Sequence, residues 1–197
     1  HGAEPTAANL GDLCERVKQE KADLGFAQDP DADRLAIVDE TGRPIGEEYT
    51  IALVVEHQLS KKAGRVVINL STTKAVDDIA RSHGASLARA RVGEINVVEE
   101  MMLRGARIGG EGNGGVISPE VHLGRDSLVG IAYVEGWDGN APCALPGNAP
   151  FLAVFHHPAD SLTPPAGDPI YFINRLQQAI AKILPFKRNE PLPGRPE

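Results

Sequence analysis

The sequence is poor in several residue types and patterns that mark particular protein classes. Aromatic residues make up 5% of the 197 positions, so a core has to be largely aliphatic and to come from the 42% of residues that are hydrophobic. No run of 18 apolar residues is present, and we therefore expect no membrane-spanning helix and no membrane partner. The two cysteines, Cys14 and Cys143, lie far apart and indicate neither a disulfide framework nor a zinc site.

Positive charge is also scarce. The chain has 20 basic and 27 acidic residues, a net charge of −7, whereas a nucleic-acid-binding surface is basic. We expect no nucleic-acid partner. No secretory signal opens the sequence, so a cytoplasmic location is the default expectation. The chain starts at His1 rather than at a methionine, which we interpret as the mark of a fragment or a processed product.

The distribution of proline divides the chain into two parts. Residues 1–135 hold four prolines, and residues 136–197 hold the other eleven. The first part has the hydrophobic patterning of a globular protein. The second part predicts an irregular, Pro-rich C-terminal tail that contains one amphipathic helix at residues 171–184.

Strand-like and helix-like segments alternate in the first part. Apolar periodicity predicts helices at residues 6–20, 47–60, 94–104 and 126–135, and another that ends at Gly84. Short apolar or β-branched runs predict strands at residues 23–28, 35–40, 65–70, 86–92, 106–110 and 116–118. This alternation from residue 45 onward predicts a layered α/β domain with a mostly parallel or mixed sheet.

Three aspartates alternate in a short loop between two apolar runs. We call residues 29–34 the acidic loop, and Asp29, Asp31 and Asp33 the acidic triad. Carboxylates repel one another and are costly to bury without a counter-charge. Oxygen ligands at this spacing suit a hard divalent cation such as Mg²⁺ or Ca²⁺. Arg34 cannot ligate a metal, but it can hold a phosphate or neutralise excess carboxylate charge.

Three other interpretations of the acidic loop stay open from the residues alone. The simplest is a solvated acidic turn. A calcium-binding EF-hand loop would have Glu40 at its twelfth position, but it requires glycine where Arg34 stands and helices on both flanks. A phosphatase with an aspartate nucleophile would use Asp29 as the attacking group, although no second signature of that class is present.

A second unusual segment has five glycines in seven positions, residues 109–115, which we call the glycine loop. Glycine lets the backbone approach a ligand closely. The loop lacks the lysine of a P-loop and the spacing of a dinucleotide fingerprint. Its hydrogen-bonding side chains are those of Glu111 and Asn113, and a carboxylate beside an amide suits sugar hydroxyls. A mobile turn without a ligand is the alternative interpretation.

The segment that follows places a glycine, an arginine and an aspartate directly ahead of a predicted helix. Asp126 is a candidate N-cap for that helix because its side chain can accept hydrogen bonds from free backbone amides. Arg125 is a candidate for a group that orients loop residues such as Glu111.

Taken in order, these segments resemble the α-D-phosphohexomutase superfamily of phosphoglucomutase, phosphomannomutase and phosphoglucosamine mutase. "ADLGFAQDPDADRLAIVDETG" resembles the magnesium loop of that family, "GGEGNGGVI" its sugar-recognition loop and "HLGRDSLVGIA" the segment after it. The resemblance implies that residues 1–44 end the second α/β domain of the family and that residues 45–135 form most of the third, a layered α/β/α domain with a mixed sheet. It leaves residues 136–197 unassigned.

The resemblance also implies a role for each candidate residue. The acidic triad would hold Mg²⁺ as the cofactor, and Arg34 would be a catalytic residue that contacts the phosphoryl group. The substrate, a hexose or hexosamine phosphate, would be bound by Glu111, Gly112, Asn113, Gly114 and Arg125. The reaction would be an intramolecular phosphoryl transfer through a phosphoserine. That serine and the phosphate clamp belong to the first and fourth domains of the family, and this chain resembles neither.

Two positions depart from the family pattern. Several relatives have histidine where this chain has Glu94, and several end the sugar loop in histidine where this chain has Gly115. We expect Glu94 to be a surface acid that opens a helix. The functional hypothesis is a phosphohexomutase fragment with little activity by itself, and the alternative is a non-catalytic module that binds Mg²⁺ and a sugar phosphate.

Overall fold

The structure of the chain is a computed structural model that describes residues 4–134 and the backbone of residues 152–155. In chain order the elements are a 3-10 turn Ala7–Asn9, α1 Gly11–Glu20, β1 Leu24–Gln28, β2 Leu35–Asp39, α2 Glu47–Lys61, β3 Val66–Asn69, α3 Ala75–Ser82, β4 Leu87–Ala90, α4 Glu94–Arg104, β5 Ile108–Gly110, β6 Val116–Ser118, β7 His122–Arg125, α5 Ser127–Val134 and β8 Leu152–Phe155. Within the described residues, no helix combines the length and apolar character needed to cross a membrane.

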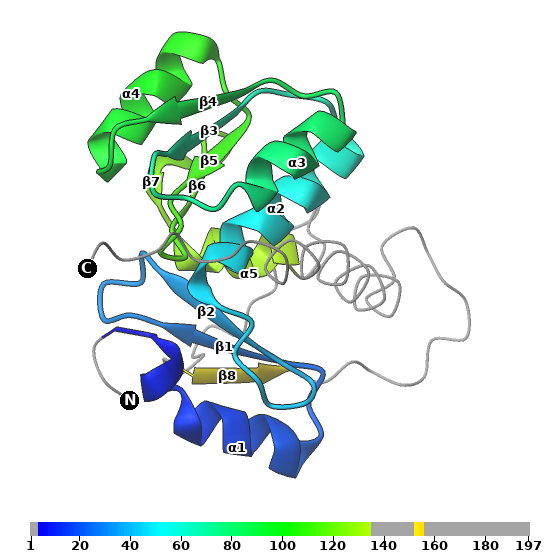
Figure 1. The fold of residues 1–197 in the computed structure, drawn as a ribbon. Coiled ribbons are helices and arrows are strands. Elements are labelled where there is room, and N and C mark those ends of the chain that lie inside the picture. The colour runs from blue at the N-terminus through cyan, green and yellow to red at the C-terminus, as the bar shows by residue number, and fades with distance from the viewer. Residues whose placement is uncertain (1–3, 135–151, 156–197) are drawn as a thin grey trace, which may run out of the picture.

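The larger sheet has five strands in the order β4-β3-β5-β6-β7. β3 runs parallel to β4 and β5, whereas β5, β6 and β7 pair antiparallel. The helices α2, α3 and α5 cover one face of this sheet, and α4 covers the other (Figure 1). The mixed sheet with helices on both faces confirms the layered α/β prediction.

Burial on both faces explains the continuous apolar run of β3. Val66 and Ile68 join the cluster under α2 and α3, whereas Val67 packs with Met101 of α4. A strand in the interior of such a sheet has no solvent face, so it shows no polar alternation. Asn69 ends β3 and is 2% exposed. The carboxyl ends of β3, β4 and β5 meet at one edge of the sheet, where parallel α/β sheets commonly bind ligands.

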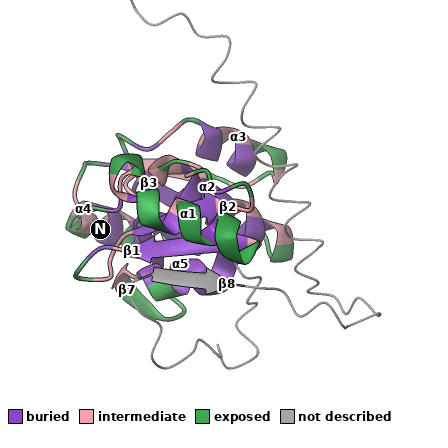
Figure 2. Cartoon of the chain, turned by 90° about the horizontal axis from the view of Figure 1, so that it is seen from below, coloured by how far each residue is buried: buried purple, intermediate pink, exposed green. Residues whose placement is uncertain are grey.

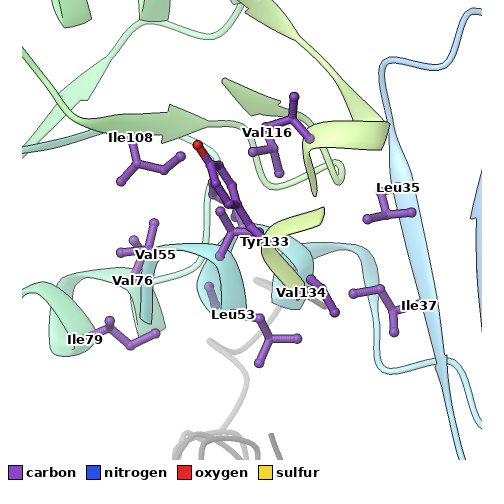
Figure 3. Packing of buried hydrophobic residues seen from close by; sticks show 14 of the residues in the cluster. Leu35, Ile37, Leu53, Val55, Val76, Ile79, Ile108, Val116, Tyr133 and Val134 are labelled. Atoms are coloured by element: carbon purple, nitrogen blue, oxygen red, sulfur yellow. The ribbon is translucent and has the colours of Figure 1, made fainter. Parts of the chain in front are cut away.

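The smaller sheet has three strands in the order β2-β1-β8, all antiparallel. α1 packs on one face through Leu13 and Val17, and its outer side is exposed (Figure 2). The other face presents Phe26, Leu35 and Ile37 to α2 and α5, which lie between the two sheets (Figures 1 and 3). The hairpin that carries the acidic loop is therefore fixed against the larger domain by a shared hydrophobic core.

Two strands were not expected from the sequence. β7 forms at residues 122–125 because β6 supplies an antiparallel partner, with a register shift between Ile117 and Ser118, although none of its own residues is buried. β8 lies inside the tail that the sequence predicts to be irregular, and it pairs with the open edge of β1. The predicted helix at residues 171–184 lies outside the described residues.

Candidate functional site

The acidic loop joins β1 to β2 and is organised around Asp29, which is 5% exposed. Its Oδ1 atom accepts hydrogen bonds from the backbone amides of Asp33 and Arg34, both at 3.0 Å. Its carbonyl accepts the amide of Ala32 at 3.1 Å, and Ala32 has a left-handed φ of 58°. The loop therefore turns tightly on its own hydrogen bonds, which hold the carboxylates of the triad on one side.

The three carboxylates of the acidic triad each offer an oxygen, and these atoms all lie within 4.8 Å of one another. Oδ1 of Asp33 is buried and has no hydrogen-bond partner among the described residues. The pKa of Asp33 is raised to about 6, first by burial and then by its contact with the Asp29 carboxyl, while Arg125 opposes the rise. Clustered carboxylate oxygens, one of them unpaired, fit a hard divalent cation.

The surroundings of the loop also bear on its alternative interpretations. Strands rather than helices flank it, so the EF-hand interpretation is wrong. Nε of Arg34 lies 3.6 Å from Oδ2 of Asp29 and 3.8 Å from Oδ1 of Asp33. With 31% of its side chain exposed, Arg34 partly neutralises the triad and is still accessible to a ligand at the rim of the site.

Glu111 of the glycine loop is 3% exposed and lies where the parallel strands end. Its Oε1 atom accepts hydrogen bonds from Nδ2 of Asn69 at 2.8 Å and from the amide of Gly93 at 3.1 Å. Its Oε2 atom accepts one from Nη1 of Arg125 at 2.8 Å. A carboxylate has about four acceptor positions, and three of those of Glu111 are filled by these contacts.

Other residues of the glycine loop lie close to backbone atoms of neighbouring segments. Oδ1 of Asn113 accepts the amide of Gly115 at 3.2 Å. A Cβ atom on Gly112 would lie 3.1 Å from the Cα atom of Thr72. Gly114 has φ +92°, and a Cβ atom there would lie 2.5 Å from the carbonyl oxygen of Leu35. Backbone packing thus requires glycine at position 114 and leaves little room for a side chain at position 112, whatever ligand the loop holds.

Backbone and side-chain hydrogen bonds join the acidic loop to the larger domain. The amide of Leu35 donates to the carbonyl of Gly114 at 3.1 Å. The amide and hydroxyl of Ser127 both donate to the carbonyl of Ala32, at 3.0 and 2.7 Å. Gln28 donates to the same hydroxyl. The structure therefore brings the acidic loop and the glycine loop, about 80 residues apart in sequence, into one site.

Arg125 ends β7 and points between the two loops, with contacts to three acids. Nη2 donates to Oδ2 of Asp33, Nη1 donates to Glu111, and Nε lies 3.4 Å from Oε2 of Glu94. Oε1 of Glu94 accepts the backbone amide of Arg125 at 2.8 Å. The predicted orientation of Glu111 by Arg125 is present in the structure.

The two helix starts at the site agree with the sequence. Oδ1 of Asp126 accepts the amides of Leu128 and Val129 at 2.8 and 3.0 Å, which confirms its role as the N-cap of α5. Glu94 is the first residue of α4, as expected, with 38% of its side chain exposed. The sequence did not indicate that its carboxylate also holds Arg125.

Three residues that shape the site were missed from the sequence: Asn69, Gly93 and Ser127. Asn69 had a detectable signal, because it is a polar residue at the end of a buried apolar strand, at the edge where ligands bind. Gly93 and Ser127 act through a backbone amide or a small hydroxyl. Neither residue type stands out without the partner that it meets in the folded chain.

The fold and the site together define a class of α/β proteins. In this class an acidic loop suited to a cation and a glycine loop meet at the carboxyl edge of a mixed sheet. Two models of one protein family match the described part of this chain. The phosphoglucomutase/phosphomannomutase alpha/beta/alpha domain II matches residues 1–42, and domain III of the same family matches residues 46–134. The chain therefore belongs to the phosphoglucomutase/phosphomannomutase, or phosphohexomutase, family.

Curated relatives and solved structures agree with this membership. A phosphoglucomutase/phosphomannomutase of Thermococcus kodakarensis is 41% identical over 132 residues, which are 66% of this chain and 29% of the relative. A phosphoglucosamine mutase of Variovorax paradoxus is 39% identical over 124 residues, 62% of this chain and 28% of the relative. The chain thus spans under a third of the length of these relatives.

Two solved structures share the fold. A phosphoglucomutase/phosphomannomutase family protein of Burkholderia thailandensis superposes with a TM-score of 0.63 at 26% identity, over 72% of this chain and 32% of that protein. A structure from Thermus thermophilus superposes with a TM-score of 0.68 at 21% identity, over 91% of this chain and 36% of that protein, and supports the fold alone.

Proposed function

We propose that this chain carries the cation-binding and sugar-binding loops of a phosphohexomutase, which moves a phosphoryl group between positions of a hexose or hexosamine phosphate. The observation that carries the proposal is the meeting of the two loops. Asp33 and Glu111 share Arg125, and Leu35 donates to Gly114, so a phosphate near the triad and a sugar near Glu111 belong to one ligand.

The acidic triad is the proposed Mg²⁺ site, with Oδ1 of Asp33, which accepts no hydrogen bond from the described residues, as one ligand atom. Bound there, Mg²⁺ supplies Lewis-acid stabilisation of charge on a phosphoryl group in transfer. Arg34, beside two of the triad carboxylates, directs its guanidinium at the same phosphoryl group as the proposed catalytic residue.

On the sugar side, Glu111 accepts a ring hydroxyl at its remaining acceptor position, and Asn113 contributes its amide group. Gly112 and Gly114 let the backbone of the glycine loop lie close to the sugar. The phosphoryl donor of this reaction is a phosphoserine on another domain of the family. We therefore expect little turnover from the 197-residue chain by itself.

A domain exchange tests the proposal directly. Residues 1–134 of this chain would replace the matching segment of the 41%-identical Thermococcus relative, and interconversion of glucose 1-phosphate and glucose 6-phosphate would be measured, with glucosamine phosphates in parallel. We expect the chimera to turn over at least one pair, and Asp31→Asn or Glu111→Gln to lower its kcat at least about a hundredfold. A folded chimera that is inactive on every pair would refute the proposal.

A further inference from the structure

Arg125 has three carboxylates around its guanidinium, as Arg34 does, but those around Arg125 come from both loops and from the start of α4. It lies 15% exposed between Asp33 of the acidic loop and Glu111 of the glycine loop. Its Nη2 and Nη1 atoms donate to one carboxylate each, so the planar group spans the two loops as a fork. Two acids that lie far apart in the sequence therefore meet at one side chain.

Glu94 and Gly115 hold this fork in place. Glu94 binds the backbone amide of Arg125 and faces its Nε atom, so both the main chain and the side chain of the arginine are located from one carboxylate. A Cβ atom on Gly115 would lie 2.4 Å from Cδ of Arg125 and 3.1 Å from its Cγ. The stem of Arg125 therefore occupies the space that a side chain at position 115 would take.

A guanidinium held in this way cannot turn toward one acid without leaving the other. Whatever locates the Asp33 carboxylate also locates the fork, and with it Oε2 of Glu111. On the far side of Glu111, Oε1 is bound by the amide of Gly93 and by Asn69. Hydrogen bonds therefore run without a break from the acidic loop through Arg125 and Glu111 to the loop after β4.

We propose that Arg125 is a positioning residue that couples the two halves of the site, so that a cation at Asp33 and a sugar phosphate at Glu111 strengthen each other's binding. The inference rests on the proposed function, because it takes the acidic triad as the cation site and Glu111 as the sugar site. Linkage requires the coupling to be reciprocal: each ligand raises the affinity of the other by the same factor.

Calorimetric titration of the 197-residue chain measures this factor. The affinity for glucose 6-phosphate is measured with and without Mg²⁺, and the affinity for Mg²⁺ with and without glucose 6-phosphate. We expect Arg125→Met to reduce the coupling factor about fivefold, the low end of the usual range for coupled sites. Arg125→Lys, which keeps the charge but not the fork, should lose most of the coupling as well.

A second variant displaces the guanidinium of Arg125 from the two acids and keeps every charged residue. Gly115→Ala pushes the Arg125 stem aside while Asp33, Glu94 and Glu111 stay in the chain. It should lower the coupling factor as Arg125→Met does. The matched control is Arg107→Met, which removes an arginine that is 16% exposed, much like Arg125, and whose partners, Glu120 and Gln58, lie in neither loop. The coupling factor should be unchanged in this variant.

NMR spectroscopy tests the coupling between the acidic loop and Gly93 without an activity assay. On addition of Mg²⁺, the amide signal of Gly93 should shift in the wild type, and the shift should fall at least about threefold in Arg125→Met, in line with the lost coupling.

If both ligands bind and every Arg125 and Gly115 variant keeps the wild-type coupling factor, the inference is overturned and the proposed function stands. If neither Mg²⁺ nor glucose 6-phosphate binds the wild-type chain, the proposed function and the inference both fail.

Discussion

The acidic loop turns on hydrogen bonds between its own residues, whereas the carboxylate of the glycine loop is held by residues from elsewhere in the chain. Asp29 accepts the amides of residues four and five positions ahead. Glu111 accepts hydrogen bonds from groups 42, 18 and 14 positions away. The turn of the acidic loop is therefore a local structure, whereas the position of the Glu111 carboxylate depends on the larger sheet.

The two loops also differ in how far their carboxylates are satisfied. Glu111 is buried but has three hydrogen bonds, one of them from an arginine. Within the described residues, Oδ1 of Asp33 accepts no hydrogen bond, and the pKa of Asp33 is raised. A carboxylate with several hydrogen bonds supports structure, whereas one that lacks them gains more from a bound cation. Changes in the glycine loop should therefore cost more stability, and changes in the acidic loop should act mainly on cation binding.

The largest loss of stability is expected where the two loops touch. Gly114→Ala places a Cβ atom 2.5 Å from the carbonyl oxygen of Leu35 at a positive φ, and we expect a loss of about 3 kcal/mol in urea unfolding. Gly84→Ala is the control, since Gly84 has φ +62° but no atom within 4 Å of the added Cβ, and it should lose about 1 kcal/mol. Equal losses of stability in the two variants would mean that the contact between Gly114 and Leu35 does not limit the residue at position 114.

Glu111→Gln should follow, because it replaces a buried carboxylate that faces Arg125, Asn69 and a backbone amide. We expect a loss of about 2 kcal/mol in the free energy of unfolding. Glu120→Gln, which disturbs an ion pair whose acid is 48% exposed, should cost at most about 0.5 kcal/mol. Similar values for the two variants in the same urea titrations would contradict the comparison.

Within the acidic loop, two substitutions should separate structure from cation binding. Asp29→Asn weakens a carboxylate that accepts two backbone amides and should lose about 1 kcal/mol. Asp31 is exposed, so Asp31→Asn should leave the stability of the metal-free protein within about 0.5 kcal/mol of wild type. Calorimetry should show at least about tenfold weaker Mg²⁺ binding for each variant. A large loss of stability in metal-free Asp31→Asn would oppose this division.

A pH dependence of the stability should also come from Asp33. Its pKa is raised from the ordinary 3.8 to about 6, so between about pH 4 and pH 6 the folded state binds more protons than the unfolded state. This carboxyl contributes stability that is fully present below about pH 4 and is lost as the pH rises through about 6. Metal-free melting curves of wild type and Asp33→Asn should show the difference between about pH 4.5 and pH 7. Parallel pH profiles for both proteins would argue against it.

Cation binding should have the opposite pH dependence. A proton on Asp33 competes with the cation for the same oxygens, so Mg²⁺ affinity should rise as the pH increases through about 6. Titrations of wild type at about pH 5 and pH 7 measure the change. The Asp33→Asn variant, with no carboxyl at this position, should show a smaller pH dependence of its residual affinity.

Much of the fold was predictable because its signals are periodic and local. α2 and α4 follow their predicted ranges closely, since long helices repeat the same apolar spacing over several turns. β7 was not predictable in the same way, because His122–Arg125 has no apolar alternation and becomes a strand only through hydrogen bonds to β6. Strand β8 likewise depends on the open edge of β1.

The amino-acid sequence by itself determined the order of most helices and strands in the first 134 residues and the chemistry of the two loops, because side-chain type and spacing act over a few residues. Only the tertiary structure decided that Arg125 stands between Asp33 and Glu111, with Glu94 holding it and Gly115 making room for it. The physical reason is that a guanidinium has no preferred partner along the chain, and packing selects which carboxylates surround it.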